Sequence, residues 1–203
     1  MLEKVTDVRA VCIAAGAIAA SPTIWNIIAQ NEHKRGTITA LLGNKYRGAY
    51  ALAAWIFGSS LYRDHLYSQA ILANPDATLV APNSTEASVL KGLGVASLGF
   101  GMTLVLSSMY KLGVTGTYLG DYFGIFLPAR VTSFPFDRFE NPMYLGSTCS
   151  FLGIALQSNS LVGVGLSAWV WAVYRVATGY FEGPYTDSIY AKRAEEQQKQ
   201  QQA

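Results

Sequence analysis

Uncharged blocks separated by short charged stretches dominate the pattern of this chain. The first three blocks are Ala10–Asn31, Gly48–Tyr62 and Gly92–Tyr110, and the fourth is Asn141–Tyr174. Blocks of this length and polarity are typical of helices that cross a bilayer or dip into it. The pattern therefore predicts an all-α integral membrane protein with four to five transmembrane or re-entrant helices.

The fourth block is too long for one span. Its 34 residues include no Asp, Glu, Lys, Arg or His, and one helix of that length would rise about 51 Å, against a hydrocarbon core of roughly 30 Å. The polar run Gln157–Ser160 in its middle favours a turn. We therefore expect a C-terminal helical hairpin with arms near Met143–Leu156 and Leu161–Tyr180, and one long tilted helix is the alternative. A hairpin would return the Asn141 and Glu182 ends to one membrane face.

Two other segments are less regular. Pro22 interrupts the first block, and because a proline kinks or breaks a helix, this block is either a bent span or a re-entrant hairpin. The side on which the N-terminus lies stays undecided. The segment Leu112–Phe139 combines glycines, aromatic residues and scattered charges, including Arg130. Aromatic residues and arginine favour the headgroup layer, so we expect an interfacial segment before the hairpin.

Composition agrees with a membrane protein. Hydrophobic residues make up 51% of the 203 positions and charged residues 14%, whereas soluble domains carry about 25% charge. The net charge of +2 does not suggest a nucleic-acid partner. Cys12 and Cys149 lack spaced His or Cys partners, so no metal site is expected. We interpret residues 1–190 as one membrane-embedded domain and residues 191–203 as a polar tail. The basic residues favour a cytoplasmic side for the first loop, the third loop and the tail.

Several polar residues lie where apolar blocks begin or end. Asn141-Pro142 is typical of a helix N-terminus, with Asn as the cap, and such an end can also bind an anion. Gly183-Pro184 is expected to end the last helix next to Glu182. The Glu182 carboxylate is either a solvated charge at a helix end or the anchor of a cationic or hydroxyl-rich ligand.

Three side chains are candidates for a proton acceptor. Glu32 and His33 open the first loop, and an imidazole changes its charge closest to neutral pH. Asp121 lies among glycines in LGDYFGI. The alternative for these residues is a cluster of charges that contacts lipid headgroups. Likewise Gly99-Phe100-Gly101 and Gly92-Leu93-Gly94 either allow close helix packing or approach a ligand.

Together these residues resemble the small phospholipid methyltransferases, which convert phosphatidylethanolamine derivatives to phosphatidylcholine. The resemblance covers nearly the whole chain and rests on WNIIAQNEHK (Trp25–Lys34), SLGFG (Ser97–Gly101), LVLSSMYKLGVTGTYLGDYFGI (Leu104–Ile125), ARVTSFPF (Ala129–Phe136), ENPMYLGST (Glu140–Thr148) and FEGPYTDSIY (Phe181–Tyr190).

The resemblance implies S-adenosyl-L-methionine as methyl donor and S-adenosyl-L-homocysteine as product. In this family a G-x-G in the third apolar block and a Glu-Glu pair after the last block bind the donor. The triplet Gly99, Phe100 and Gly101 matches the first element. Glu182 matches the first residue of the pair, but Gly183 replaces the second, which puts that contact in doubt. Asn141 and Tyr144 would complete the donor site.

The implied reaction passes a methyl group from a sulfonium to a neutral amine, so the ammonium headgroup must first lose a proton. His33, Glu32 or Asp121, directly or through a water, is the expected base. The quaternary ammonium product suits aromatic faces, which could come from four residues: Tyr118, Tyr122, Phe123 and Tyr144. Mono- and dimethylated headgroups are the expected substrates, in the endoplasmic reticulum membrane or a mitochondrial membrane.

Two alternatives remain open. A methyltransferase of the isoprenylcysteine carboxyl type shares the N-P-x-Y entry of ENPMYLG, but its anionic substrate needs a pair of arginines rather than a base. A non-enzymatic membrane scaffold would use the polar residues at the ends of the spans only as anchors.

Overall fold

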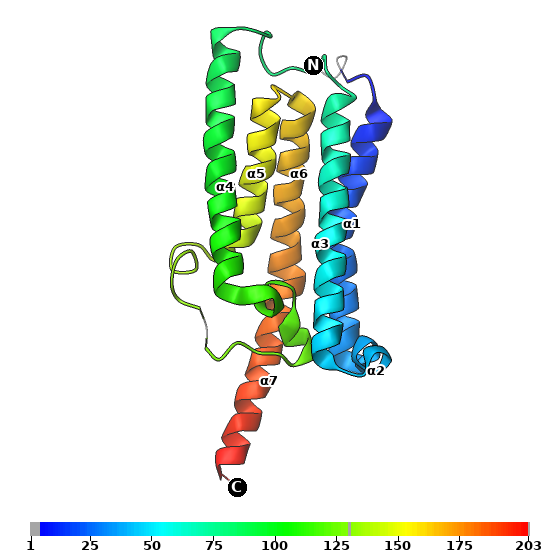
Figure 1. Cartoon of the computed structure of the whole chain (residues 1–203), viewed down its shortest axis with the longest axis vertical. Helices are drawn as coiled ribbons and strands as arrows, with labels where there is room; N and C mark the ends of the chain where they lie inside the picture. Colours follow the sequence, from blue (N-terminus) through cyan, green and yellow to red (C-terminus); the bar gives the residue numbers. More distant parts are fainter. Residues whose placement is uncertain (1–4, 130, 203) are drawn as a thin grey trace.

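The computed structural model describes residues 5–129 and 131–202, so Arg130 of the expected interfacial segment lies outside the described residues. The long helices of these described residues stand side by side as an upright bundle (Figure 1). The elements are α1 (Val8–Arg35), α2 (Thr37–Leu42), α3 (Lys45–Leu72), α4 (Thr85–Thr117), η2 (Gly120–Phe123), α5 (Pro142–Gln157), α6 (Leu161–Val176), η3 (Ala177–Glu182) and α7 (Gly183–Gln202).

The all-helical membrane architecture is confirmed. Within the described residues, three helical stretches are long and apolar enough to cross a membrane, namely α1, the stretch Thr85–Phe123 and the stretch Leu161–Gln200. Helices α3 and α5 run beside them in the bundle (Figure 1). The count of four to five spans stays a prediction.

The C-terminal hairpin is also confirmed. Helix α5 ends at Gln157 and α6 begins at Leu161, so the expected polar run forms the turn. Asn159 adopts a left-handed conformation with φ of 48°, and its side chain exchanges two hydrogen bonds with the backbone of Val80. The Ser160 hydroxyl accepts a bond from the Gly163 N–H and so caps α6. The loop before α4 therefore holds the turn in place.

The first block is one continuous helix, which decides between the two expected shapes. Helix α1 includes Pro22 without a break, and the Pro22 carbonyl accepts a hydrogen bond from the Asn26 side chain. The re-entrant hairpin is thereby ruled out. The two chain termini lie at opposite ends of the bundle (Figure 1). The first loop, the third loop and the tail share the end opposite the N-terminus, as their basic residues led us to expect.

Glycines bring α4 and α5 into close contact. A Cβ atom on Gly94 would lie 2.7 Å from the Gly153 carbonyl oxygen, and one on Gly146 would lie 2.6 Å from that of Gly101. Since real side chains do not tolerate such distances, both glycine pairs allow the backbones to touch, as in other membrane helix pairs. The packing alternative is therefore realised at Gly94 and at Gly101.

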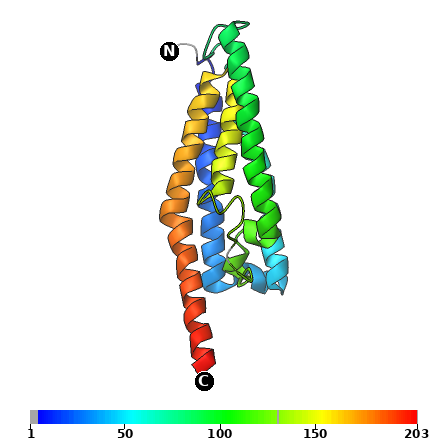
Figure 2. The same ribbon diagram turned by 90° about the vertical axis from the view of Figure 1, so that its left-hand side faces the viewer.

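The expectation that Gly183-Pro184 ends the last helix is wrong. Helix α6 continues through the π-helical segment η3 into α7, and Figure 2 shows one uninterrupted rod that projects beyond the bundle. Pro184 is the second residue of α7 and directly follows the π-helical segment. Gly183 has helical angles, with φ of −57° and ψ of −59°. The boundary expected between residues 190 and 191 falls inside α7.

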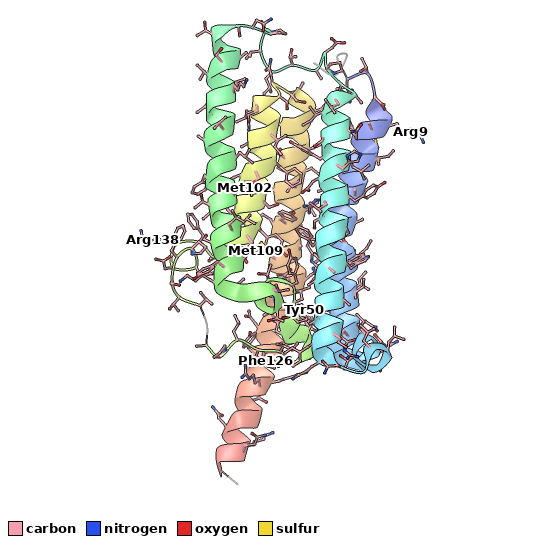
Figure 3. All side chains as sticks on the ribbon, viewed as in Figure 1. Arg9, Tyr50, Met102, Met109, Phe126 and Arg138 are labelled. Carbon is pink, nitrogen blue, oxygen red and sulfur yellow. The ribbon has the colours of Figure 1, made fainter. Side chains whose placement is uncertain are left out.

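The interfacial segment is partly helical. Helix α4 runs to Thr117, although Gly113 leaves the helical conformation with φ of 63°. The short helix η2 follows, and its Tyr122 and Phe123 are buried against α1 and α3. Figure 3 shows Arg138 of this segment beside α4, on the side of the molecule opposite to Arg9 at the start of α1.

Candidate functional site

A cavity of about 470 Å³ lies between the helices of the bundle, at the end that holds η2. Trp25, Tyr118, Met102 and Met109 contribute apolar walls, and Figure 3 shows both methionines on α4. A few polar side chains converge on the same space: Arg63, Asp64, Asn141, Tyr144, Tyr174 and Glu182. A concave apolar site with a small number of placed polar groups is typical of ligand binding.

The two ends of the hairpin meet in this cavity. The Tyr144 hydroxyl donates a hydrogen bond of 2.5 Å to Glu182 Oε2. Tyr144 lies in the first turn of α5, whereas Glu182 is the last residue of η3. Single turns of π-helix occur frequently at functional sites, and this one joins α6 to α7 at the cavity.

Asn26 of α1 supplies an unused acceptor beside the same carboxylate. Its side chain is 5% exposed and lies next to the Glu182 carboxyl group. The Nδ2 group donates to the Pro22 carbonyl, but the buried Oδ1 atom has no partner among the described residues. Because an unsatisfied buried acceptor is costly, Asn26 Oδ1 is suited to a ligand N–H or hydroxyl group. Asn26 was missed at the sequence level, although it belongs to the WNIIAQNEHK segment.

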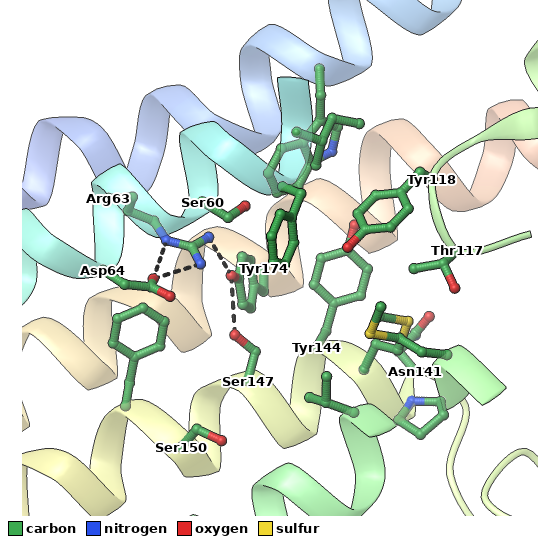
Figure 4. Close-up of a pocket in the computed structure, with 18 of the residues that line it drawn as sticks. Ser60, Arg63, Asp64, Thr117, Tyr118, Asn141, Tyr144, Ser147, Ser150 and Tyr174 are labelled. Atoms are coloured by element: carbon green, nitrogen blue, oxygen red, sulfur yellow. Dashed lines mark hydrogen bonds and ion pairs between the residues drawn. The ribbon is translucent and has the colours of Figure 1, made fainter. Parts of the chain in front are cut away.

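Aromatic rings line the cavity around these polar groups. The rings of Tyr144 and Tyr174 meet edge to face, with centroids 4.8 Å apart. Tyr118 lies nearby in Figure 4, and Trp25 also lines the space. Such faces attract cations such as quaternary ammonium groups. Of the four aromatic residues expected to form a box, Tyr118 and Tyr144 line the cavity, whereas Tyr122 and Phe123 are buried outside it.

Arg63 lies deeper in the cavity, and the sequence analysis assigned it no role. Its guanidinium group donates to Asp64 Oδ1 at 3.0 and 2.8 Å and to the Tyr174 hydroxyl at 2.8 Å. Tyr174 also lies 3.4 Å from the Ser147 hydroxyl, which completes the chain of bonds in Figure 4. Only 6% of Arg63 is exposed. The signal for it was a charged triplet, Arg63–His65, inside an otherwise helical block.

The residues expected to bind the donor divide into two groups. Asn141, Tyr144 and Glu182 line the cavity. Pro142 is the first residue of α5 as expected, but the Asn141 side chain makes no capping hydrogen bond, so its amide can face a ligand. Gly183 follows Glu182 without lining the cavity.

The G-x-G triplet lies on α4, outside the set of residues that line the cavity. Gly101 is buried against Gly146 of α5. Gly99 has open space where a Cβ would lie, and Phe100 is 46% exposed with its ring 6.1 Å from that of Phe139. Met102, the next residue, does reach the cavity. Donor binding by the triplet stays a prediction.

The three candidate bases occupy different environments at the same end of the bundle. Both carboxylate oxygens of Glu32 accept backbone N–H groups of α2, from Ile38 at 2.6 Å and from Thr39 at 3.1 Å. This buried carboxylate therefore stabilises the start of α2, a task unrelated to proton transfer. Asp121 is close enough to both His33 and Glu182 for their charges to interact.

His33 packs against aromatic rings of two elements. Its ring centroid lies 6.3 Å from that of Tyr122 and 5.7 Å from that of Tyr185. Tyr122 and Tyr185 stack on each other at 5.3 Å. His33 is exposed and, like Glu32 and Asp121, is not among the residues that line the cavity.

Comparison with known proteins shows the family to which the chain belongs. Residues 90–193 match the family described as phospholipid methyltransferase. The chain belongs to the phospholipid methyltransferase family. It is 48% identical over 174 residues to the phosphatidyl-N-methylethanolamine N-methyltransferase of Saccharomyces cerevisiae, a match that covers 85% of this chain and 81% of the relative.

Other relatives of this family extend the similarity. The phosphatidyl-N-methylethanolamine N-methyltransferase of Emericella nidulans is 46% identical over 92% of this chain and 88% of its own length. The phosphatidylethanolamine N-methyltransferase of Homo sapiens is 41% identical over 87% of this chain and 86% of its own. No solved structure matches the chain.

Proposed function

We propose that this protein is a phospholipid N-methyltransferase that moves methyl groups from S-adenosyl-L-methionine to phosphatidylethanolamine derivatives. Mono- and dimethylated headgroups are the proposed substrates and phosphatidylcholine is the proposed final product. The yeast and Emericella relatives, both named phosphatidyl-N-methylethanolamine N-methyltransferase, support the methylated headgroups. The human relative, named for phosphatidylethanolamine itself, supports the same class of lipid.

The observation that carries this proposal is the meeting of Tyr144 and Glu182 in one cavity. The donor, as a sulfonium, and the final product, as a quaternary ammonium, are both cationic at the reacting centre. Glu182 offers a carboxylate, and the faces of Tyr118, Tyr144 and Trp25 offer sites for such cations. In a methyl transfer the protein contributes mainly by holding the two reacting centres close and in line.

The donor fits Glu182, which lines the cavity, and Asn26, which lies beside Glu182. It carries an ammonium group and ribose hydroxyls, all of which are hydrogen-bond donors. Glu182 and the unpartnered Asn26 Oδ1 are acceptors for such groups. When bound, the donor supplies the activated methyl group. The chain's own residues hold it and exclude water, since the rest of the lining is largely apolar.

A route for the substrate proton starts at the cavity and leads towards the aqueous end of the bundle. Asp121 lies within charge interaction of both His33 and Glu182, and neither Asp121 nor His33 lines the cavity. We propose this pair as the base, and because neither residue lines the cavity, a water or Glu182 itself would relay the proton. Glu32 is proposed only as the cap of α2.

A labelled methyl-transfer assay tests the function. The purified protein in mixed micelles receives radiolabelled donor with either monomethyl-phosphatidylethanolamine or a farnesylcysteine analogue. We expect label only in the phospholipid. Label in the farnesylcysteine ester would establish the carboxyl methyltransferase alternative, and label in neither would favour the scaffold. Placement in the endoplasmic reticulum or a mitochondrial membrane is a separate proposal, which organelle fractionation tests.

A further inference from the structure

The cavity contains one positive charge deep in the bundle. Among the described residues that line it, the acidic and basic side chains other than tyrosine are Arg63, Asp64, Glu140 and Glu182. Three are carboxylates, and Arg63 is the single cation of this set. Arginine inside a membrane bundle is costly, and where it faces a cavity it marks a ligand or ion site by default.

The guanidinium group is held in place but not saturated. Asp64 binds one side of it and the Tyr174 hydroxyl binds the other (Figure 4). These contacts use three of its five N–H groups, so two remain without a partner among the described residues. The Phe151 ring lies against it, 5.2 Å from the guanidinium carbon to the ring centroid. A fixed, partly unsatisfied guanidinium is suited to bidentate recognition of an anion.

Arg63, which is suited to an anion, is connected through side-chain contacts to Glu182, which is suited to a cation. Arg63 binds the hydroxyl of Tyr174, the Tyr174 ring packs on the Tyr144 ring, and the Tyr144 hydroxyl binds Glu182. Opposite charges therefore occupy two positions along one wall of one cavity. A ligand that carries both an anionic and a cationic group matches this wall.

We propose that Arg63 binds the anionic group of a reactant, positioned by Asp64 and Tyr174. The inference rests on the proposed function, because that function fixes which anions reach the cavity. They are the carboxylate of the donor and the phosphodiester of the lipid headgroup. Both present two oxygens to a guanidinium fork, and both belong to molecules whose cationic part would lie towards Glu182.

The experiment compares Arg63→Gln and Arg63→Lys with Arg47→Gln, an exposed arginine of the same helix outside the cavity lining. In the first arm, calorimetry measures binding of S-adenosyl-L-homocysteine and of its analogue without the carboxylate, in the absence of lipid. In the second arm, the KM for monomethyl-phosphatidylethanolamine is measured in mixed micelles.

Arg63→Gln is expected to show either a roughly tenfold weaker affinity for S-adenosyl-L-homocysteine or a roughly tenfold higher KM for the lipid. Arg63→Lys should recover part of this loss, and Arg47→Gln should show none. Weaker binding of S-adenosyl-L-homocysteine, with the analogue unaffected, assigns Arg63 to the donor carboxylate. A higher KM at unchanged donor affinity assigns it to the lipid phosphate. If both quantities stay within a factor of about two of the wild-type values, the inference is overturned.

Two controls separate the role of Arg63 from a loss of folding and from a failure of the proposed function. Arg63→Gln leaves Asp64 without its partner, so Arg63→Gln/Asp64→Asn provides an uncharged variant whose melting in detergent confirms that it folds. Wild-type protein that binds S-adenosyl-L-homocysteine but methylates no phospholipid would refute the proposed function alone. The first arm would then decide the inference, and unchanged product affinity in Arg63→Gln would overturn it.

Discussion

The Tyr144 hydroxyl binds Glu182 Oε2 at 2.5 Å, although the two residues are 38 positions apart in the chain. This bond closes the hairpin at the end where the cavity lies. It joins two residues of the expected donor site that lie on antiparallel arms of the hairpin. The predictions below start from this contact.

Replacement of Glu182 by Gln is expected to weaken donor binding by roughly tenfold, about 1.4 kcal/mol. The change removes the negative charge and keeps the shape, so the loss reports the attraction between the carboxylate and the donor's cationic groups. Calorimetry with S-adenosyl-L-homocysteine measures it. Glu195→Gln, at an exposed position of α7, is the matched control. Equal affinities in the two variants would remove Glu182 from the donor site.

Asn26→Ala is expected to weaken donor binding, because the bound donor loses the Oδ1 acceptor, which has no partner among the described residues. The change also removes the bond from Nδ2 to the Pro22 carbonyl, so a fall in stability of about 1 kcal/mol is expected as well. Asn31→Ala, one helical turn and a half further along α1, serves as control. A lower melting temperature at unchanged affinity would show that Asn26 is structural.

Turnover is expected to fall by roughly a hundredfold in His33→Ala or Asp121→Asn if these residues accept the substrate proton. Donor affinity should persist, because neither side chain lines the cavity. Turnover and product binding are measured on the same preparations. His65→Ala, an exposed histidine of α3 outside the lining, is the control. Normal turnover in both variants would refute the assignment of the base.

Glu32→Ala is expected to reduce stability by about 1 kcal/mol, the usual cost of losing a helix cap. Both carboxylate oxygens bond to the backbone of α2, so folding should suffer while turnover per folded molecule persists. Thermal melting and a turnover assay corrected for the folded fraction separate the two. Loss of turnover in fully folded Glu32→Ala would instead restore Glu32 as a base.

The glycines of α4 allow a sharp test of the expected G-x-G site. Gly101→Ala should destabilise the protein as Gly94→Ala does, by roughly 1–3 kcal/mol, because each Cβ would collide with α5. Gly99 has open space, so Gly99→Ala should fold normally. Reduced donor affinity in Gly99→Ala would therefore show that this surface of α4 contacts the donor. Full affinity would limit the role of the triplet to helix packing.

Sequence patterns recovered most of the architecture because the bilayer restricts the choices. The length of the fourth block favoured a hairpin over one long tilted helix, and its polar middle indicated the turn. Pro22 could not be interpreted in the same way, since the proline removes only one backbone hydrogen bond and α1 continues through it without a break. Gly183-Pro184 was wrongly predicted to end the last helix. Segment η3 absorbs the irregularity, so the chain stays helical through both residues.

The sequence by itself determined the helical membrane class, the hairpin and the polar residues at its two ends, because apolar length and turn residues act locally. It also marked Asn141, Tyr144 and Glu182, whose position at the ends of apolar blocks is visible in one dimension. Only the tertiary structure decided which groups share the cavity. Arg63 and Asn26 look like isolated polar residues along the chain, and they reach Tyr174 and Glu182 only because α1 and α3 pack beside the hairpin.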